Sequence, residues 1–242
     1  MHLIWGDECT GSAGQLPAQW DVRETDQWQP ANELQRYTRS PSNVAYNGQG
    51  QLVITARKDD VLGGTFPYTS GKISTPRTTG SFLWLGGMVE TRIKLPLGVG
   101  CWPAFWMVGQ DSVYGWPACG ELDVMEAPVM AGKPRQIHQG THSPGPTNQD
   151  VPMGVTPTLA GQGDWHTYSA RWEYGQIDFF VDSLRTGQIT RSMVEAAGGR
   201  WVFDHHPMYL ILNLAVGGWA GAPDPSWSEQ SMSVDYVRVY GN

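Results

Sequence analysis

Basic residues, cysteines and long apolar runs are all scarce in this chain of 242 residues. Lysine and arginine together number 16 against 23 aspartates and glutamates, so the formal net charge is −7. Nucleic acids and anionic membranes are bound by basic surfaces, and we therefore expect neither as a partner. No stretch approaches the roughly 18 uninterrupted apolar residues of a transmembrane helix. The N-terminal MHLIWGDE also lacks the basic and apolar regions of a signal peptide. A neutral polymer suits this composition better.

The cysteines Cys9, Cys101 and Cys119 are odd in number, so at least one thiol is free. Cys101 and Cys119 flank two segments that would pair as an antiparallel hairpin, which places them near opposite ends of the ladder. We predict no bridge between them. Nothing beside any of the three suggests an activated thiolate, so we interpret them as small buried hydrophobic residues.

Glycine and proline are plentiful, at 30 and 17 residues, and they separate short stretches of alternating apolar residues. This pattern predicts strands, and no repeat of roughly 20–50 residues accompanies it. The one stretch that favours a helix is RSMVEAAGG, Arg191 to Gly199. We predict a single all-β domain over residues 1–242, built as a β-sandwich. The expected strands lie around Leu52–Ala56, His166–Trp172, Ile177–Val181, Tyr209–Leu214 and Val237–Val239.

The segment GELDVMEAP gathers Glu121, Asp123 and Glu126 in an otherwise apolar stretch. The apolar residues between them favour a half-buried strand with the acids on its open face. In a strict two-residue period Glu126 would point away from the other two acids. We therefore predict one extra residue, a β-bulge, near Val124 or Met125.

Two carboxylates on one face of a strand are suited to cleaving a glycosidic bond. One of them, protonated, gives its proton to the leaving oxygen, and the other attacks or stabilises the sugar carbon; retention requires roughly 5–5.5 Å between them. Neighbouring carboxylates do not both ionise easily, so one pKa should rise and leave an acid protonated at neutral pH. The alternative is a solvated strand face without chemistry.

Tryptophans surround this acidic segment, and the chain contains 12 of them. Trp102 and Trp106 are four residues apart and so share a strand face, while Trp116 precedes Glu121 by five residues. Core packing is the ordinary role of any single tryptophan. Because tryptophan is rarely buried completely, we expect several of these rings to line a groove where sugars stack.

GCWPAFWMVG followed by WPACGELDVMEAP resembles the catalytic hairpin of glycoside hydrolase family 16, in its laminarinase-type branch with the bulged ExDxxE motif. The resemblance runs nearly end to end, from LIWGDE through NELQRYT and YTSGKIST to PMYLILNLAVGGWAG and VDYVRVY. It implies a lectin-like jelly roll of two curved antiparallel sheets with an open substrate groove. It also implies a retaining endo-glycosidase that hydrolyses β-1,3 linkages in β-glucans by double displacement.

The resemblance assigns roles to the acidic segment. It implies that Glu121 is the nucleophile, Glu126 the general acid/base, and Asp123 the residue between them that tunes the pair. His142, in IHQGTHSPG, matches the family's histidine on the adjacent strand; a structural or solvated histidine is the alternative. His138, four residues earlier, invites a helical zinc motif, but the glycines and proline of this segment exclude a stable helix.

By the same resemblance, the groove would bind sugar through several further residues. Lys72 and Met88 stand where relatives often carry arginine, so we expect the contacts in the groove to differ from theirs. The substrate could therefore also be a β-1,3-galactan or a mixed-linkage glucan. A transglycosylase and a non-catalytic carbohydrate-binding domain are the other classes considered. The implied substrate-binding residues are Asn32, Trp102, Trp106, Trp116 and Trp219.

Many relatives hold one structural cation on the convex side, and oxygen ligands of the implied kind suit calcium. The positions that match are a backbone oxygen near Glu8, the carbonyl of Gly50 and the acid Asp235; a solvated strand residue is the alternative for Asp235.

We expect catalysis to require no cofactor. We further expect a monomeric, extracellular protein with a polysaccharide as its partner, whose leader is absent from this chain.

Overall fold

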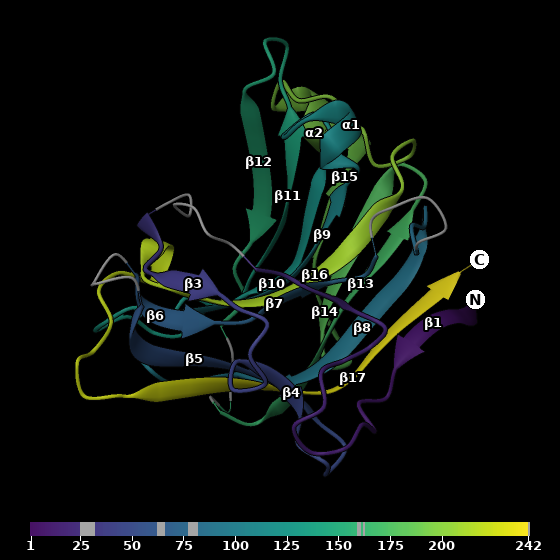
Figure 1. Ribbon diagram of the computed structural model, residues 1–242. Helices are drawn as coiled ribbons and strands as arrows, with labels where there is room; N and C mark the ends of the chain where they lie inside the picture. The colour runs from purple at the N-terminus through teal and green to yellow at the C-terminus, as the bar shows by residue number, and fades with distance from the viewer. Residues whose placement is uncertain (25–31, 62–65, 77–81, 159–160, 162, 242) are drawn as a thin grey trace.

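The computed structural model describes residues 1–24, 32–61, 66–76, 82–158, 161 and 163–241. Nearly all of its regular structure is β, arranged as two large sheets that pack against each other (Figure 1). This confirms the predicted all-β sandwich. The two termini lie side by side because the first strand pairs with the last, with His2 opposite Gly241.

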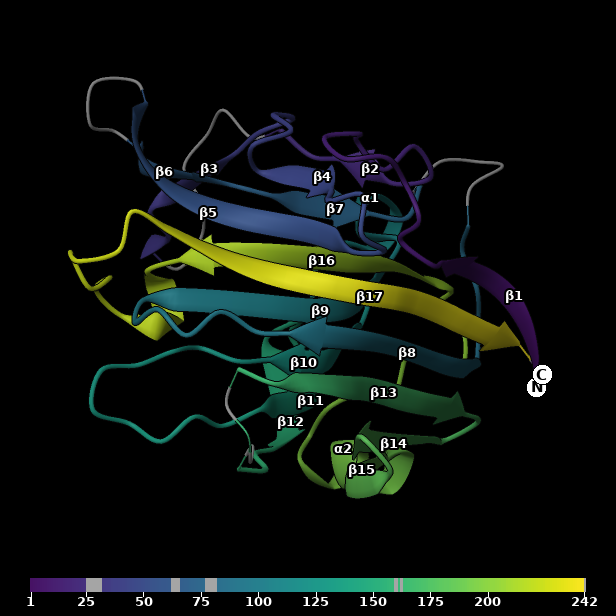
Figure 2. The same cartoon turned by 90° about the horizontal axis from the view of Figure 1, so that it is seen from below.

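Among the described residues, one sheet contains ten strands and forms the long face that Figure 2 shows from below, with β5, β17, β8 and β13 next to one another. Two short strands join this sheet from the side, β1 (His2–Asp7) on β17 and β4 (Val44–Tyr46) on β5. In order across the sheet the others are β15 (Leu184–Thr190), β14 (Gln176–Val181), β13 (Trp165–Glu173), β8 (Gly87–Lys94), β17 (Glu229–Gly241), β5 (Leu52–Val61), β6 (Phe66–Ser70) and β3 (Gln35–Tyr37).

The second sheet, which has seven strands in the part of the chain that the structure describes, carries the acidic segment. In order they are β12 (Asp150–Val155), β11 (His138–Pro144), β10 (Glu121–Glu126), β9 (Cys101–Gly109), β16 (Met208–Val216), β7 (Lys72–Ser74) and β2 (Asp21–Val22). All the described pairings in the two sheets are antiparallel except that of β3 with β6, which is parallel. The predicted antiparallel sheets are thus confirmed with one exception at an edge.

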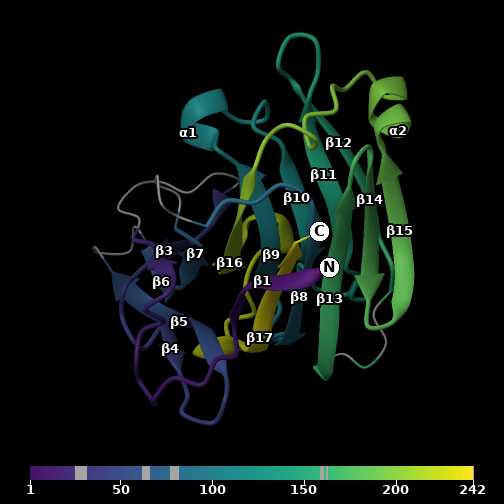
Figure 3. The same cartoon turned by 90° about the vertical axis from the view of Figure 1, so that its right-hand side faces the viewer.

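Helices are short and lie outside the sheets. The predicted helix is present as α2 (Arg191–Ala196), and the side chain of its N-cap Thr190 accepts a hydrogen bond from the backbone N–H of Met193. The sequence did not reveal α1 (Asp111–Tyr114) or the 3-10 turn η2 (Gly218–Ala220). Both α-helices lie at the same end of the molecule (Figure 3). None of the helices in the described ranges has the length and apolar character needed to span a bilayer.

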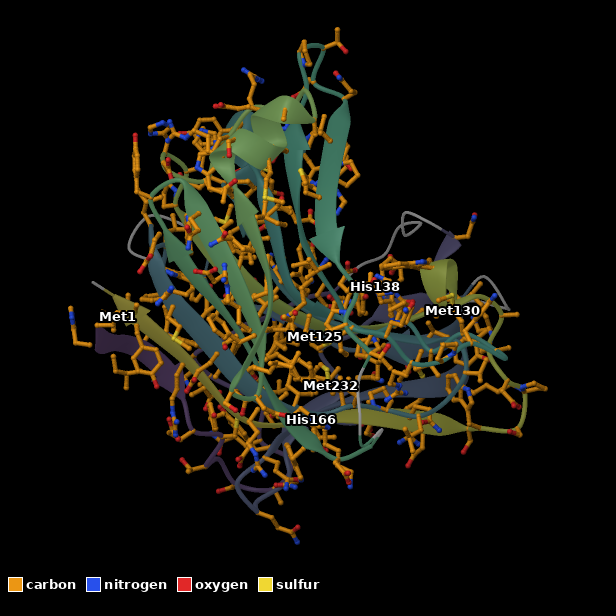
Figure 4. All side chains as sticks on the ribbon, turned by 180° about the vertical axis from the view of Figure 1, so that it is seen from behind. Met1, Met125, Met130, His138, His166 and Met232 are labelled. Atoms are coloured by element: carbon orange, nitrogen blue, oxygen red, sulfur yellow. The ribbon has the colours of Figure 1, made fainter. Side chains whose placement is uncertain are left out.

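The hydrophobic core fills the space between the two sheets. Met125 from β10 and Met232 from β17 are completely buried in its middle (Figure 4). Cys9, Cys101 and Cys119 are free thiols, and all three are buried, which confirms that no bridge joins the last two. Burial raises the pKa of Cys101 and of Cys119 to about 12, so neither is a reactive thiolate at neutral pH.

Strand β16 is buried on both faces and lies inside the seven-stranded sheet, between β9 and β7. Leu214 belongs to the main core. Tyr209 and Ile211 instead pack with Val108 in a second apolar cluster. The strand predicted around Tyr209–Leu214 is therefore correct, but its apolar residues do not share one face.

Candidate active site

A β-bulge in β10 turns the three acidic side chains toward one face of the strand. Asp123 pairs with Trp106 on β9 and Met125 pairs with the adjacent Phe105, so Val124 is the extra residue. The pairing of β10 with β11 shifts over the same stretch. The predicted bulge is confirmed, and without it strict alternation would send one acid into the core.

The apolar residues of β10 anchor it between the sheets. Leu122, Val124 and Met125 are completely buried, whereas Glu121 and Glu126 at the ends of the strand remain partly exposed. The strand therefore holds its acids rigidly on the outer face of the seven-stranded sheet.

A groove of about 810 Å³ crosses this outer face and contains all three acids. Its walls extend from β12 and β11 on one side to β7 and β3 on the other. Concave sites with aromatic walls and a few convergent polar groups are typical of ligand binding. The tryptophans and histidines along it are Trp102, Trp106, Trp116, His138, His142 and Trp219.

Two tryptophans donate hydrogen bonds to the two outer acids. The indole nitrogen of Trp102 lies 3.0 Å from a carboxylate oxygen of Glu126. That of Trp116 lies 2.8 Å from a carboxylate oxygen of Glu121. The sequence predicted these rings as sugar platforms but gave no sign of these bonds, because each joins a loop or a neighbouring strand to β10.

The environment separates the protonation states of the acids. Burial raises the pKa of Glu126 to about 7, and the charge of Glu121 adds to the rise. Burial also raises the pKa of Glu121, but His142 and the Trp116 hydrogen bond oppose that rise by favouring the charged form. Near neutral pH, Glu126 is thus suited to hold a proton and Glu121 to carry a negative charge.

Asp123 is buried between the two glutamates, with only 4% of its surface exposed. Burial, followed by the charges of Glu121 and Glu126, raises the pKa of Asp123 well above its usual range. The Asp123 carboxyl is hydrogen-bonded to Glu121. A protonated Asp123 donates this bond, and the donation stabilises the negative charge on Glu121.

His142 lies on β11 directly opposite Glu121. Its Nε2 lies 3.6 Å from a carboxylate oxygen of Asp123, and its Nδ1 lies 2.7 Å from Oδ2 of Asp150. Single oxygens of Glu121 and Asp123 and one ring nitrogen of His142 lie within 4.8 Å of one another. The structure thus brings His142 to the acids as predicted, together with Asp150, which sequence analysis missed.

The opposite wall of the groove is built around Trp106. Its indole nitrogen donates to the side-chain oxygen of Asn213 at 2.7 Å, and the amide of Asn213 donates to the hydroxyl of Tyr37 at 3.1 Å. The ammonium of Lys72 lies 5.0 Å from the Trp106 ring centroid. Lys72 therefore contacts the groove as expected. Met88 does not, because it lies on β8 in the other sheet.

Trp219 lies in η2 and lines the groove beside Trp102. The two rings meet edge to face with their centroids 5.7 Å apart. The His138 ring, whose position Figure 4 marks, lies 4.3 Å from the Trp219 ring. These three side chains form an aromatic wall next to Glu126, since His138 is also its partner across the strands.

Asn32 is exposed, with a left-handed φ of 60°, and it is not among the residues that line the groove. Its neighbour Glu33 does line the groove, and burial raises the pKa of Glu33. The backbone of Glu33 forms an isolated bridge with Gly217. The structure therefore supports Glu33 over Asn32 as the groove residue of this segment.

The three positions predicted to bind a cation lie away from the groove. The carboxylate of Glu8 pairs with Arg238, and Oδ2 of Asp235 lies 2.7 Å from a guanidinium nitrogen of Arg92. What remains for a cation is the second oxygen of Asp235 and the backbone carbonyls near Glu8 and Gly50. Oxygen donors fit calcium in kind, so this site stays a prediction.

Comparison with known proteins places this geometry in a family. The model of glycosyl hydrolases family 16 matches residues 32–238. A glucan endo-1,3-beta-glucosidase A1 of Niallia circulans is 38% identical over 270 residues, which cover 99% of this chain and 38% of that protein. A beta-glucanase of Rhodothermus marinus is 35% identical over 250 residues, which cover 99% of this chain and 85% of that protein.

Solved structures agree with these relatives. The crystal structure of the laminarinase catalytic domain from Thermotoga maritima superposes with a TM-score of 0.85 and 34% identity. That superposition covers 100% of this chain and 98% of the other. The match extends over both sheets and the bulged strand, and the chain belongs to glycosyl hydrolase family 16.

Proposed function

We propose that this protein is a retaining, endo-acting glycoside hydrolase that cuts β-1,3 linkages in β-glucans. The observation that carries the proposal is the pair Glu121 and Glu126 on one face of a bulged strand, inside a groove, with environments that favour different protonation states. The relatives named endo-1,3-beta-glucosidase and laminarinase support the linkage.

In the first half of the reaction, Glu126 donates its proton to the glycosidic oxygen while Glu121 attacks the anomeric carbon. The carbon–oxygen bond to the leaving sugar breaks and an ester bond to Glu121 forms. In the second half, Glu126, now ionised, takes a proton from water, and the water oxygen displaces Glu121. Two inversions at the same carbon give overall retention.

The shape of the groove supports cleavage within a chain. Beside the main groove, a further hollow of about 390 Å³ shares Lys72, Trp106, Trp116 and Glu121 with it. The His138 and Trp219 wall lies at the Glu126 side of the same groove. Sugar-binding surface on both sides of the acids allows a polymer to lie across them, as an endo-acting enzyme requires.

The test is a digest of laminarin, lichenan, β-1,3-galactan, agarose and xyloglucan followed by sizing of the products, with Glu121→Gly as the inactive control. We expect laminarin to yield a mixture of oligosaccharides of intermediate length early in the digest. Monosaccharide alone would contradict endo-action. Products longer than an oligosaccharide substrate would identify a transglycosylase, and inertness toward every polymer would favour a carbohydrate-binding domain.

We also propose that the protein acts outside the cell as a monomer, with neither membrane nor nucleic acid as a partner, and that it binds a structural calcium. A polysaccharide is too large to enter a cell intact, which supports an extracellular site of action. The negative net charge supports the absence of polyanionic partners.

A further inference from the structure

Asp150 lies at the start of β12 and is hydrogen-bonded to His142, which faces the three acids. Its Oδ2 lies 2.7 Å from Nδ1 of His142, while its Oδ1 is buried without a hydrogen-bond partner. The side chains of Asp150 and His142 are 25% and 28% exposed. The hydrogen bond to His142 is therefore the contact that holds this partly buried carboxylate in place.

The contact fixes how the imidazole of His142 faces the acids. A carboxylate that accepts the Nδ1 proton sets the tautomer and the rotation of the ring, so Nε2 points away from Asp150. Here Nε2 points toward Asp123, 3.6 Å away. The ring of Trp116 lies 5.9 Å from the imidazole and tilted to it, on the side of Glu121.

We propose that Asp150 is a positioning residue of the active site: it orients His142, and through His142 the Asp123 carboxyl that hydrogen-bonds Glu121. This rests on the proposed function, because it assigns Asp150 a part in the same reaction. Asp150 makes no hydrogen bond to either acid, but its charge raises the pKa of Glu121 and of Asp123 through space. Asp150→Asn removes this charge and keeps an acceptor for the Nδ1 proton, so it separates the charge effect from the orientation of His142.

The alternative is an ordinary ion pair that only stabilises the hairpin of β11 and β12. The chain contains a matched pair of that kind: Nδ1 of His166 lies 2.8 Å from Oδ2 of Asp182. His166 lies on β13, in the ten-stranded sheet, away from the groove. Asp182→Ala removes a histidine–carboxylate contact of the same kind, together with the bond that Asp182 accepts from the backbone N–H of Thr167. Since this change does not approach the acids, it serves as the control for kcat.

The experiment is a double-mutant cycle on kcat with laminarin, using Asp150→Ala, His142→Ala and both together. We expect Asp150→Ala to lower kcat by about ten- to a hundredfold, by analogy with the range found when the partner that orients a metal-binding histidine is removed. In the His142→Ala background the same change should lower kcat no further. Asp150→Asn should recover part of the loss, because its amide oxygen can still accept the Nδ1 proton.

Equal losses from Asp150→Ala with and without His142 would overturn the proposal, as would a kcat that matches the Asp182→Ala control. Melting temperatures of all variants separate misfolding from loss of rate. A nitrogen-15 spectrum of the wild-type imidazoles tests the geometry without activity, since we expect His142 to hold its proton on Nδ1 and Asp150→Ala to release it. If wild-type protein cleaves none of the glycans, the proposed function fails while this spectrum still decides the contact.

Discussion

The indole nitrogen of Trp116 donates a hydrogen bond to Oε2 of Glu121, at 2.8 Å, from a ring that is 50% exposed. One side chain thus offers a flat surface to the groove and a proton to the predicted nucleophile. Trp102 and Glu126 repeat the arrangement at the other end of the strand. Each tryptophan therefore has two separable contributions, stacking and hydrogen bonding, and substitutions can distinguish them.

Replacing Trp116 with alanine should weaken oligosaccharide binding by about 1–3 kcal/mol, the scale of buried aromatic contacts in binding sites. Trp116→Phe should restore most of the affinity because it keeps a ring. Since the indole hydrogen bond lowers the pKa of Glu121, both variants should move the acidic limb of kcat/KM to higher pH. Calorimetry and pH profiles measure the two effects. A large fall in melting temperature with unchanged affinity would show instead that Trp116 is a packing residue.

The basic limb of the pH profile should report the proton on Glu126. Its pKa is raised to about 7, so kcat/KM should fall as the pH rises through about 7. Trp102→Phe removes a hydrogen bond that favours the ionised form, and the limb should therefore move to higher pH. Trp219→Phe alters the same wall without removing that bond and is the matched control. A limb that stays in place in Trp102→Phe would assign it to another group.

The raised pKa of Glu126 also predicts how stability depends on pH. Between the ordinary value of 4.5 and about 7 the folded state binds more protons than the unfolded state, so stability falls as the pH rises through this window. Glu126→Gln removes that dependence. We expect the variant to melt several degrees higher than wild type at pH 8 and at nearly the same temperature at pH 4, given about 2–4 °C per kcal/mol for a domain of this size. Equal differences at both pH values would contradict the assigned shift.

The stereochemistry of azide products distinguishes the two glutamates. Glu121→Gly should not hydrolyse glucan, and azide entering the vacated space should attack an activated glycoside directly and give an inverted product. Glu126→Gly should still form the covalent intermediate from an activated aryl glycoside, which needs no proton, and azide should release it with retention. The reverse pattern would exchange the two roles, and inversion by the wild-type enzyme would exclude the double displacement.

Calcium binding at Asp235 should appear as a ligand effect on melting. Chelation should lower the melting temperature and added calcium should restore it, because a ligand held only by the folded state stabilises it by mass action. Asp235→Asn also removes the charge that pairs with Arg92, so its melting temperature alone is not informative. The informative quantity is the rise in melting temperature on adding calcium, which the variant should lack. A wild-type melting curve unaffected by both treatments would remove the site.

The acidic strand was predictable because its signal is local. Leu122 and Met125 cannot both face the core while the acids face outward unless the strand contains one extra residue. That mismatch in the alternation is enough to locate the bulge that the structure contains. The same reasoning fails for β16, which is buried on both faces and so shows no alternation to read. Local periodicity predicts which residues face the core when one face of a strand is exposed to solvent, and it does not do so for a strand that is buried on both faces.

The parts of the site that sequence analysis missed are those made by long-range contacts. Asp150 reaches His142 across a hairpin turn, and Asn213 meets Trp106 from the neighbouring strand. Asp150 lies in none of the quoted motifs, and Asn213 lies inside PMYLILNLAVGGWAG without any local sign of its contact with Trp106. The register of the strands sets the position of both residues. The prediction named Asn32 as the groove residue, whereas its neighbour Glu33 lines the groove. A segment outside regular strands has no period that fixes which side chain faces the groove.

The three buried thiols have a practical consequence. No covalent cross-link holds this fold, and Cys9, Cys101 and Cys119 are all inaccessible, so the protein should mature equally well in reducing and oxidising surroundings. A cysteine introduced at an open position would then be the single thiol that reacts with a maleimide dye. Tyr174, 79% exposed at the turn between β13 and β14, is such a position, and a dye there would lie in the sheet that does not carry the groove.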